Sequence, residues 1–86
     1  MPYIKQERRK QLEGGAEMLG KMCKNGGELN FVLTVIAKSF LYKKDNPKYE
    51  DRAMVVGNLE CMIHEFKRRV LDSYEDQKRR ENGDVY

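Results

Sequence analysis

The sequence predicts a mainly α-helical protein, a small bundle of about three helices with short extended termini, assembled as a homo-oligomer. Apolar residues recur at helical spacing in two long segments, and breaks rich in glycine, asparagine or proline separate the segments. A chain of 86 residues is expected to form one helical domain, residues 1–86, with little interior of its own. One helix is apolar on two sides, so a second copy of the chain is expected to cover part of it.

The N-terminal segment is predicted to begin extended and then to become helical. Pro2 supplies no amide donor and disfavours helix in the residue before it, so residues 1–4 are expected to be extended. Gly14 and Gly15 each cost a helix about 1 kcal/mol relative to alanine. The pair is therefore predicted to interrupt the helical pattern. A first helix is expected over about residues 16–24, with room for a shorter helical segment before it.

The second helix is predicted over about residues 28–44. Asn25-Gly26-Gly27 ends the preceding helix, because asparagine and glycine tolerate the left-handed geometry of a helix end. Phe31 and Val35 project from a different side than the main apolar stripe. That stripe consists of Leu29, Val32, Leu33, Ile36, Ala37, Phe40 and Leu41. Self-association would explain two apolar sides, and a three-helix bundle with a locally apolar exterior is the alternative.

The third helix is predicted from about residue 49 through at least residue 74, after the Asp45-Asn46-Pro47 break. Its apolar positions have the spacing of a helix packed lengthwise against partners. These positions are Val55, Leu59, Met62, Phe66 and Val70. The charged run after residue 74 can extend the helix, and Asn82-Gly83 then forces a turn. Residues 2–4 and 84–86 are expected to pair as two short strands.

Charge and hydropathy exclude several classes of protein. The 17 Lys and Arg against 14 Asp and Glu give a net charge of +3, too balanced for binding a long nucleic acid through its phosphates. No stretch of about 20 apolar residues predicts a membrane span. No apolar signal segment precedes Cys23 and Cys61, so the protein is expected to be cytoplasmic, with two free thiols packed as small core residues.

The sequence predicts no enzyme, no metal site and no cofactor. It contains no glycine-rich phosphate loop and no serine nucleophile elbow. Cys61 and His64 form a Cys-x-x-His pair on one helix, but zinc needs three or four ligands. The Met-Pro-Tyr-Ile start is similar to that of tautomerases with an N-terminal proline base. A charged run follows it here instead of an alternating β-strand, so that interpretation is disfavoured.

Basic and aromatic residues gather towards both ends of the chain. Arginine can bind phosphate oxygens with two hydrogen bonds, and tyrosine can stack on a base. The alternative is a solvated helix surface, because acidic residues alternate with the basic ones at positions such as Glu75 and Arg79. Such carboxylates would repel a long phosphate backbone, but they can accept hydrogen bonds from base edges.

Four segments carry a resemblance to a known family: MPYIKQE, GELNFV, VVGNLECMIHEFKRRV and YEDQKRRENGDVY. They resemble a widespread group of small phage-encoded proteins that includes the anti-CBASS cyclic-nucleotide sponges. The likeness covers most of the chain except residues 12–24, and the closing motif is its most specific part. The resemblance implies a viral immune-evasion protein in the cytoplasm of an infected bacterium. It also implies a homotetramer that binds cyclic dinucleotides such as 3′3′-cGAMP without cleaving them.

The resemblance supplies the ligand, and the residue types suggest where the ligand would bind. We expect a site between protomers, where the N-terminal segment meets the C-terminal half of the third helix. Arginines would neutralise the phosphates, tyrosines would stack on purines, and Asn82 and Asp84 would read base edges. The predicted site residues are Tyr3, Lys5, Arg8, Arg68, Arg69, Tyr74, Asn82, Asp84 and Tyr86.

Two other classes of function stay open. The protein could be an oligomeric interaction protein whose apolar helix binds a host protein. It could also be a helical nucleic-acid-binding protein, whose affinity would fall steeply with salt as counterions are released.

Overall fold

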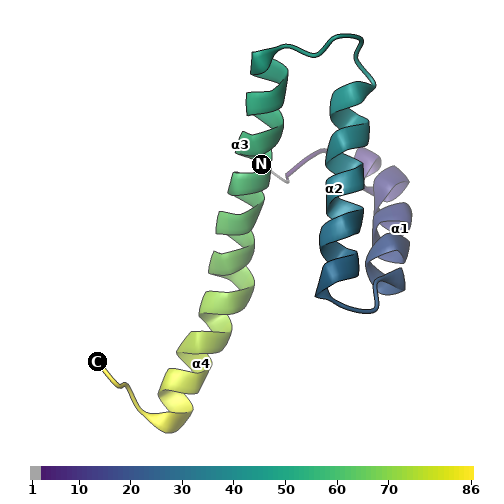
Figure 1. Ribbon diagram of the computed structural model, residues 1–86. Coiled ribbons are helices and arrows are strands. Elements are labelled where there is room, and N and C mark those ends of the chain that lie inside the picture. The colour runs from purple at the N-terminus through teal and green to yellow at the C-terminus, as the bar shows by residue number, and fades with distance from the viewer. Residues whose placement is uncertain (1–2) are drawn as a thin grey trace. The chain divides into compact units, whose positions relative to one another are not determined.

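The computed structural model describes residues 3–86 and confirms a mainly helical protein (Figure 1). The elements are α1 (Gln6–Met22), α2 (Gly26–Tyr42), α3 (Tyr49–Phe66), the π-helical segment η1 (Lys67–Leu71) and α4 (Asp72–Asn82). The last three follow one another without a loop and together correspond to the third predicted helix. No helix in the described range is long and apolar enough to span a membrane.

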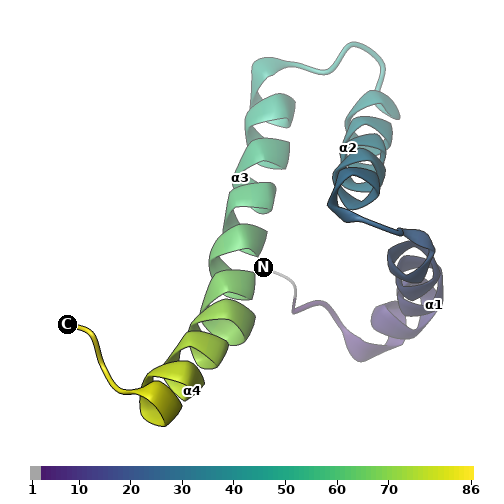
Figure 2. The same cartoon turned by 60° about the horizontal axis from the view of Figure 1, so that its bottom comes forward.

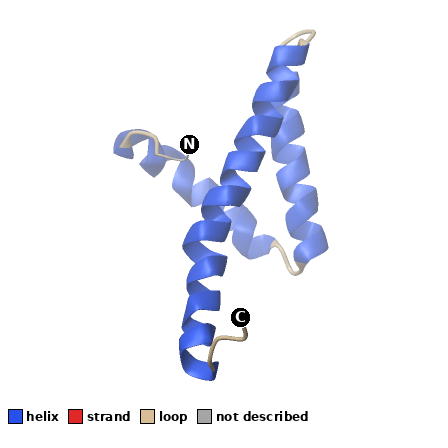
Figure 3. Ribbon diagram, turned by 90° about the vertical axis from the view of Figure 1, so that its left-hand side faces the viewer, coloured by secondary structure: helices blue, strands red, loops and turns tan. Residues whose placement is uncertain are grey.

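The predicted pair of terminal strands is wrong for the part of the chain that the structure describes. Residues 3–86 contain no strand (Figure 3), and Pro2 lies outside this range. Two isolated strands of three residues would gain too few hydrogen bonds to offset the cost of ordering two chain ends.

The chain divides into two compact units. The N-terminal unit, residues 2–55, holds α1, α2 and the first turns of α3. The C-terminal unit, residues 56–86, holds the rest of α3 with η1 and α4. A single domain over residues 1–86 stays a prediction.

In the N-terminal unit, α1 runs through Gly14 and Gly15, so the predicted interruption is wrong. The flanking residues are mostly good helix formers, and two glycines cost such a helix only about 2 kcal/mol in total. The helix begins after Lys5, whose carbonyl accepts the backbone N–H groups of Arg8 and Arg9 at 3.1 Å each. The separate segment expected before residue 16 is therefore the first part of one helix.

Helix α2 begins two residues before the expected start because Asn25 caps it. The Asn25 Oδ1 accepts the N–H of Glu28 at 2.9 Å, and the Glu28 carboxylate accepts the N–H of Lys24 at 2.9 Å. These two bonds satisfy donors that a helix start leaves without partners. The connection from α1 is consequently short (Figure 2).

The two apolar sides predicted for α2 are present. Leu33, Ala37 and Leu41 are half-buried and follow one another at four-residue spacing. Phe31 and Val35 point to another side of the helix and are 68% and 43% exposed. The second side therefore has no cover within the N-terminal unit.

The turn between α2 and α3 is held by one carboxylate. Asp51 accepts the backbone N–H of Lys48 at 2.8 Å and pairs with the Lys44 ammonium group at 3.0 Å. These bonds, with the hydrogen bond from Lys48 as the larger cause, hold the pKa of the Asp51 carboxyl below its usual range. Asn46, with φ of 56°, makes the left-handed bend of the turn.

The lengthwise apolar positions of the third predicted helix are unequally covered. Val55 and Leu59 are half-buried, whereas Phe66 and Val70 are 64% and 52% exposed. η1 lies between Phe66 and α4, and its wider turn changes which residues share a face. The extension of the helix beyond residue 74 is confirmed, because α4 ends at Asn82.

No residue in the range 3–86 is fully buried. Within this range the helices therefore form without a fully buried core.

Candidate ligand-binding surface

The predicted site residues lie in both units. Tyr3, Lys5 and Arg8 belong to the N-terminal unit. The other six belong to the C-terminal unit: Arg68, Arg69, Tyr74, Asn82, Asp84 and Tyr86. The structure gathers only some of them around one feature, an open hollow at the end of α4.

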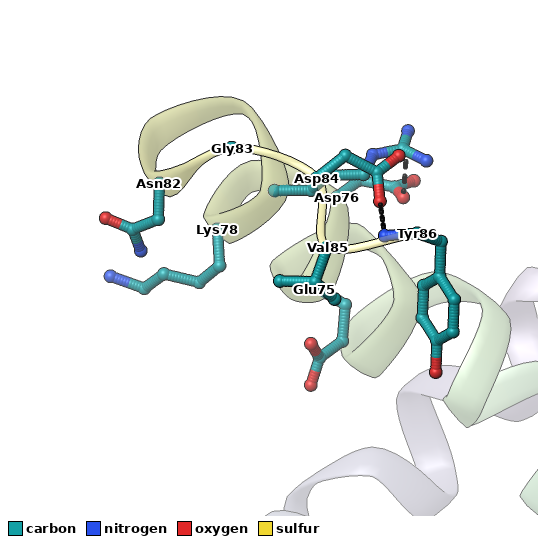
Figure 4. Close-up of a pocket in the computed structure, with 9 residues that line it drawn as sticks. Glu75, Asp76, Lys78, Asn82, Gly83, Asp84, Val85 and Tyr86 are labelled. Atoms are coloured by element: carbon teal, nitrogen blue, oxygen red, sulfur yellow. Dashed lines mark hydrogen bonds and ion pairs between the residues drawn. The ribbon is translucent and has the colours of Figure 1, made fainter.

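This C-terminal hollow has a volume of about 500 Å³ and is formed by the last turns of α4 and the tail that follows (Figure 4). Three predicted residues line it: Asn82, Asp84 and Tyr86. Its other lining residues are Glu75, Asp76, Lys78, Arg79, Gly83 and Val85. An open hollow of this size can accommodate a small ligand, since ligand pockets typically measure roughly 300–1,000 Å³.

The hollow exists because the chain turns sharply at Gly83. This residue has a φ of 88°, a conformation that side chains disfavour, and its N–H donates to the Arg79 carbonyl at 2.9 Å. Beyond it, the Asp84 Oδ1 accepts the N–H of Tyr86 at 2.9 Å. Lys78 and Asn82 extend on one side of the tail in Figure 4 and Tyr86 on the other. These side chains therefore do not face one another across the hollow.

The charges in the hollow are mixed. Its lining includes three carboxylates and two cations. Arg79 lies 3.6 Å from the Asp76 carboxylate, and Lys78 lies 3.3 Å from Glu81. These pairs are solvent-exposed, and such pairs contribute at most about 1 kcal/mol, so an anionic ligand can displace them. The carboxylates would in turn suit N–H donors of a ligand.

Arg68 and Arg69 do not line the hollow. Both guanidinium groups bind one carboxylate, that of Glu65, at 2.9 Å and 3.0 Å. The group carries a net positive charge that a phosphate could neutralise. The role of these two arginines in a site between protomers stays a prediction.

Tyr74 also lies outside the lining of the hollow, but it touches one lining residue. The Lys78 ammonium group lies 5.5 Å from the centre of the Tyr74 ring, within the range of a cation–π contact. Tyr74 can thus position Lys78, although it does not itself face the hollow.

The three N-terminal site residues lie near the start of α1. Lys5 caps the helix through its carbonyl, and the Arg8 guanidinium donates to the Gln11 side chain. A second hollow of about 210 Å³ lies beside them and is lined by Ile4, Arg9, Leu12, Glu13 and Ala16. Tyr3, Lys5 and Arg8 are not among its lining residues.

The sequence prediction missed the helix residues that complete the C-terminal hollow. Lys78 and Arg79 line the hollow but are not among the predicted site residues. Residues 75, 78, 79 and 82 share one face of a helix by spacing alone. The turn at Gly83 then brings the tail to that face. Helical spacing together with the Asn-Gly turn could have predicted that these helix residues and the tail line one hollow.

The thiols and the histidine have no site of their own. Cys23 is half-buried and Cys61 is exposed, so their prediction as core residues is wrong. Cys23 lies just after the end of α1, and Cys61 lies on an exposed part of α3, so neither thiol is packed in a core. Within residues 3–86 no group of three or more histidines, cysteines or acidic residues is arranged to hold a metal ion.

The described residues define a small all-helical protein with uncovered apolar helix faces and an open hollow at its C-terminal end. The chain belongs to the family described as Domain of unknown function (DUF6899), which matches residues 1–85. No curated protein and no solved structure matches the chain.

Proposed function

We propose that the protein is a phage immune-evasion protein that sequesters cyclic dinucleotides such as 3′3′-cGAMP without cleaving them. It acts as a homotetramer in the cytoplasm of the infected bacterium. The sequence resemblance suggests the ligand and the tetramer. The observation that carries the proposal is the C-terminal hollow, where Asn82, Asp84 and Tyr86 lie with two cationic side chains.

The chemistry of the hollow suits the parts of such a ligand. Arg79 would bind a phosphate in place of Asp76, and the Tyr86 ring would stack on a purine. The Asn82 amide can both donate and accept hydrogen bonds along a base edge, and the Asp84 carboxylate can accept them. Because the hollow is open, a second protomer would have to close it around the ligand.

Titration calorimetry with a panel of cyclic mono- and dinucleotides tests the proposal. The full chain should bind one dinucleotide with submicromolar affinity and fewer than one ligand per chain. Chromatography afterwards should recover the ligand intact. Absence of binding across the panel would overturn the proposal.

A matched pair of variants locates the site. Arg79→Ala should weaken binding about tenfold or more, because it removes a charged hydrogen-bond donor to phosphate. Arg80→Ala makes the same change at the next residue, which does not line the hollow, and should bind like the original chain. Equal losses in both variants would indicate a general charge effect instead of this site.

A second candidate function is an oligomeric interaction protein that binds a host protein or nucleic acid. The exposed stripe of α2 favours it, since uncovered apolar faces mark interfaces. Two results together would favour this alternative: no binding of any cyclic nucleotide, and an affinity for a long nucleic acid that falls steeply as the salt concentration rises.

A further inference from the structure

The outer face of α2 carries a stripe with the spacing of a coiled-coil seam. It consists of Glu28, Phe31, Val35, Lys38 and Tyr42, which step by three, four, three and four residues. Phe31 is 68% exposed, Val35 43% and Tyr42 57%. We name these five residues the outer stripe. They lie across the helix from Leu33, Ala37 and Leu41, which the N-terminal unit half-buries.

The outer stripe is exposed apolar surface that a partner can cover. Leu29, Ile36 and Phe40, on another side of α2, are also 46–48% exposed. Phe31, at 68%, is the most exposed large apolar side chain of α2. Because uncovered apolar faces mark interfaces, the outer stripe is a place where an interface can form.

The charges on the outer stripe favour a second copy of this chain as that partner, in an antiparallel arrangement. Its only two charged residues, Glu28 and Lys38, have opposite signs and stand at its first and fourth positions, with Tyr42 following Lys38. In a parallel pair, each would meet its own like charge. In an antiparallel pair, Glu28 of one copy meets Lys38 of the other, and the helix dipoles are also opposed favourably.

One register satisfies the two charged residues together with Phe31 and Val35, whereas Tyr42 would lie opposite position 24, before the start of α2. When Glu28 lies opposite Lys38 of the second copy, Phe31 lies opposite its Val35, because both pairs are symmetric about position 33. These are the layers expected of an antiparallel coiled coil with this spacing. A two-fold axis through position 33 therefore builds a closed, self-complementary interface.

We propose that α2 packs antiparallel against α2 of a second copy through the outer stripe, with Glu28 of each chain paired to Lys38 of the other. One oxygen of the Glu28 carboxylate accepts the N–H of Lys24 within the chain, which leaves the other free to receive the ammonium group. The proposal specifies the contact behind the homo-oligomer of the proposed function, but it does not depend on the ligand. All its experiments are made without nucleotide, so its failure can be told apart from the failure of ligand binding.

Sedimentation equilibrium of the full chain tests the interface. The original chain should form at least a dimer at micromolar concentration. Phe31→Ala should weaken association on the order of a hundredfold, since each interface loses two phenyl groups. Tyr49→Ala removes a more exposed aromatic ring from α3 and should leave association unchanged. A monomeric original chain, or equal association of the original and Phe31→Ala chains, would overturn the proposal.

A charge reversal keeps the proposal testable if Phe31→Ala misfolds. Lys38→Glu places two carboxylates opposite each other at both ends of the seam and should weaken association at least tenfold. Lys10→Glu makes the same charge change on α1 and should not affect it. Equal behaviour of these two variants would contradict the seam.

Disulfide formation tests the orientation, with Cys23 and Cys61 replaced by serine. Glu28→Cys chains refolded together with Lys38→Cys chains should form mixed disulfides. Neither variant alone should do so, because its two cysteines would be about 15 Å apart along the seam. Rapid disulfide formation in Glu28→Cys alone would show a parallel pair and overturn the proposed arrangement.

Discussion

Replacing Gly14 or Gly15 by alanine should stabilise the protein. Both glycines lie inside α1, and a β-carbon built at either position meets no atom within 4 Å. Alanine therefore fits the native backbone and raises helix propensity by about 1 kcal/mol at each position. Each single variant should be more stable by about that amount, and the double variant by about twice as much.

Thermal unfolding followed by far-UV circular dichroism measures this effect. For a chain of this size, 1 kcal/mol corresponds to a rise in Tm of about 4–8 °C. All chains must be compared at one concentration, because association contributes to the apparent stability. Gly57→Ala in α3, where a β-carbon likewise meets nothing, should give a rise of similar size.

A fall in Tm for both single variants would refute the reasoning. It would mean either that α1 breaks at the glycine pair or that another chain approaches the glycines closely. If Tm falls only in the α1 variants and rises as expected in Gly57→Ala, the cause of the fall lies in α1.

Three further substitutions test local contacts. Asn25→Ala removes the cap of α2 and should lower the free energy of unfolding by about 1 kcal/mol in urea titrations, and an unchanged midpoint would contradict the capping contact. Asp51→Asn should destabilise at pH 7, and its difference from the original chain should shrink as the pH falls below about 4. The folded-state pKa of Asp51 is lowered, so its stabilisation is present above about pH 4 and is lost as the pH falls through that lower pKa. A pH-independent difference between the two chains would contradict this assignment. Gly83→Ala forces a side chain into a φ of 88° and should speed amide exchange in the last turn of α4, whereas unchanged exchange would refute the strained turn.

Much of the helical architecture could be predicted from the sequence. The Asn25-Gly26-Gly27 and Asp45-Asn46-Pro47 breaks marked the connections on either side of α2. The side on which Phe31 and Val35 project was also correct, because helical spacing alone determines it.

Other features had no adequate local signal. The glycine pair predicts a break in α1, but the helix propensity of the surrounding residues outweighs the cost of two glycines. No sequence pattern in Lys67–Leu71 predicts a π-helical segment. Three of the predicted site residues line the C-terminal hollow, and Lys78 and Arg79 were missed because their place there depends on the turn at Gly83.

Native mass spectrometry of the full chain mixed with 3′3′-cGAMP is the most direct test of the central proposal, because it counts chains and ligands in one complex. We predict a tetramer that carries intact ligand at fewer than one molecule per chain. A monomer without ligand, at concentrations where the ligand is in excess, would contradict both the oligomer and the sequestration of cyclic dinucleotides.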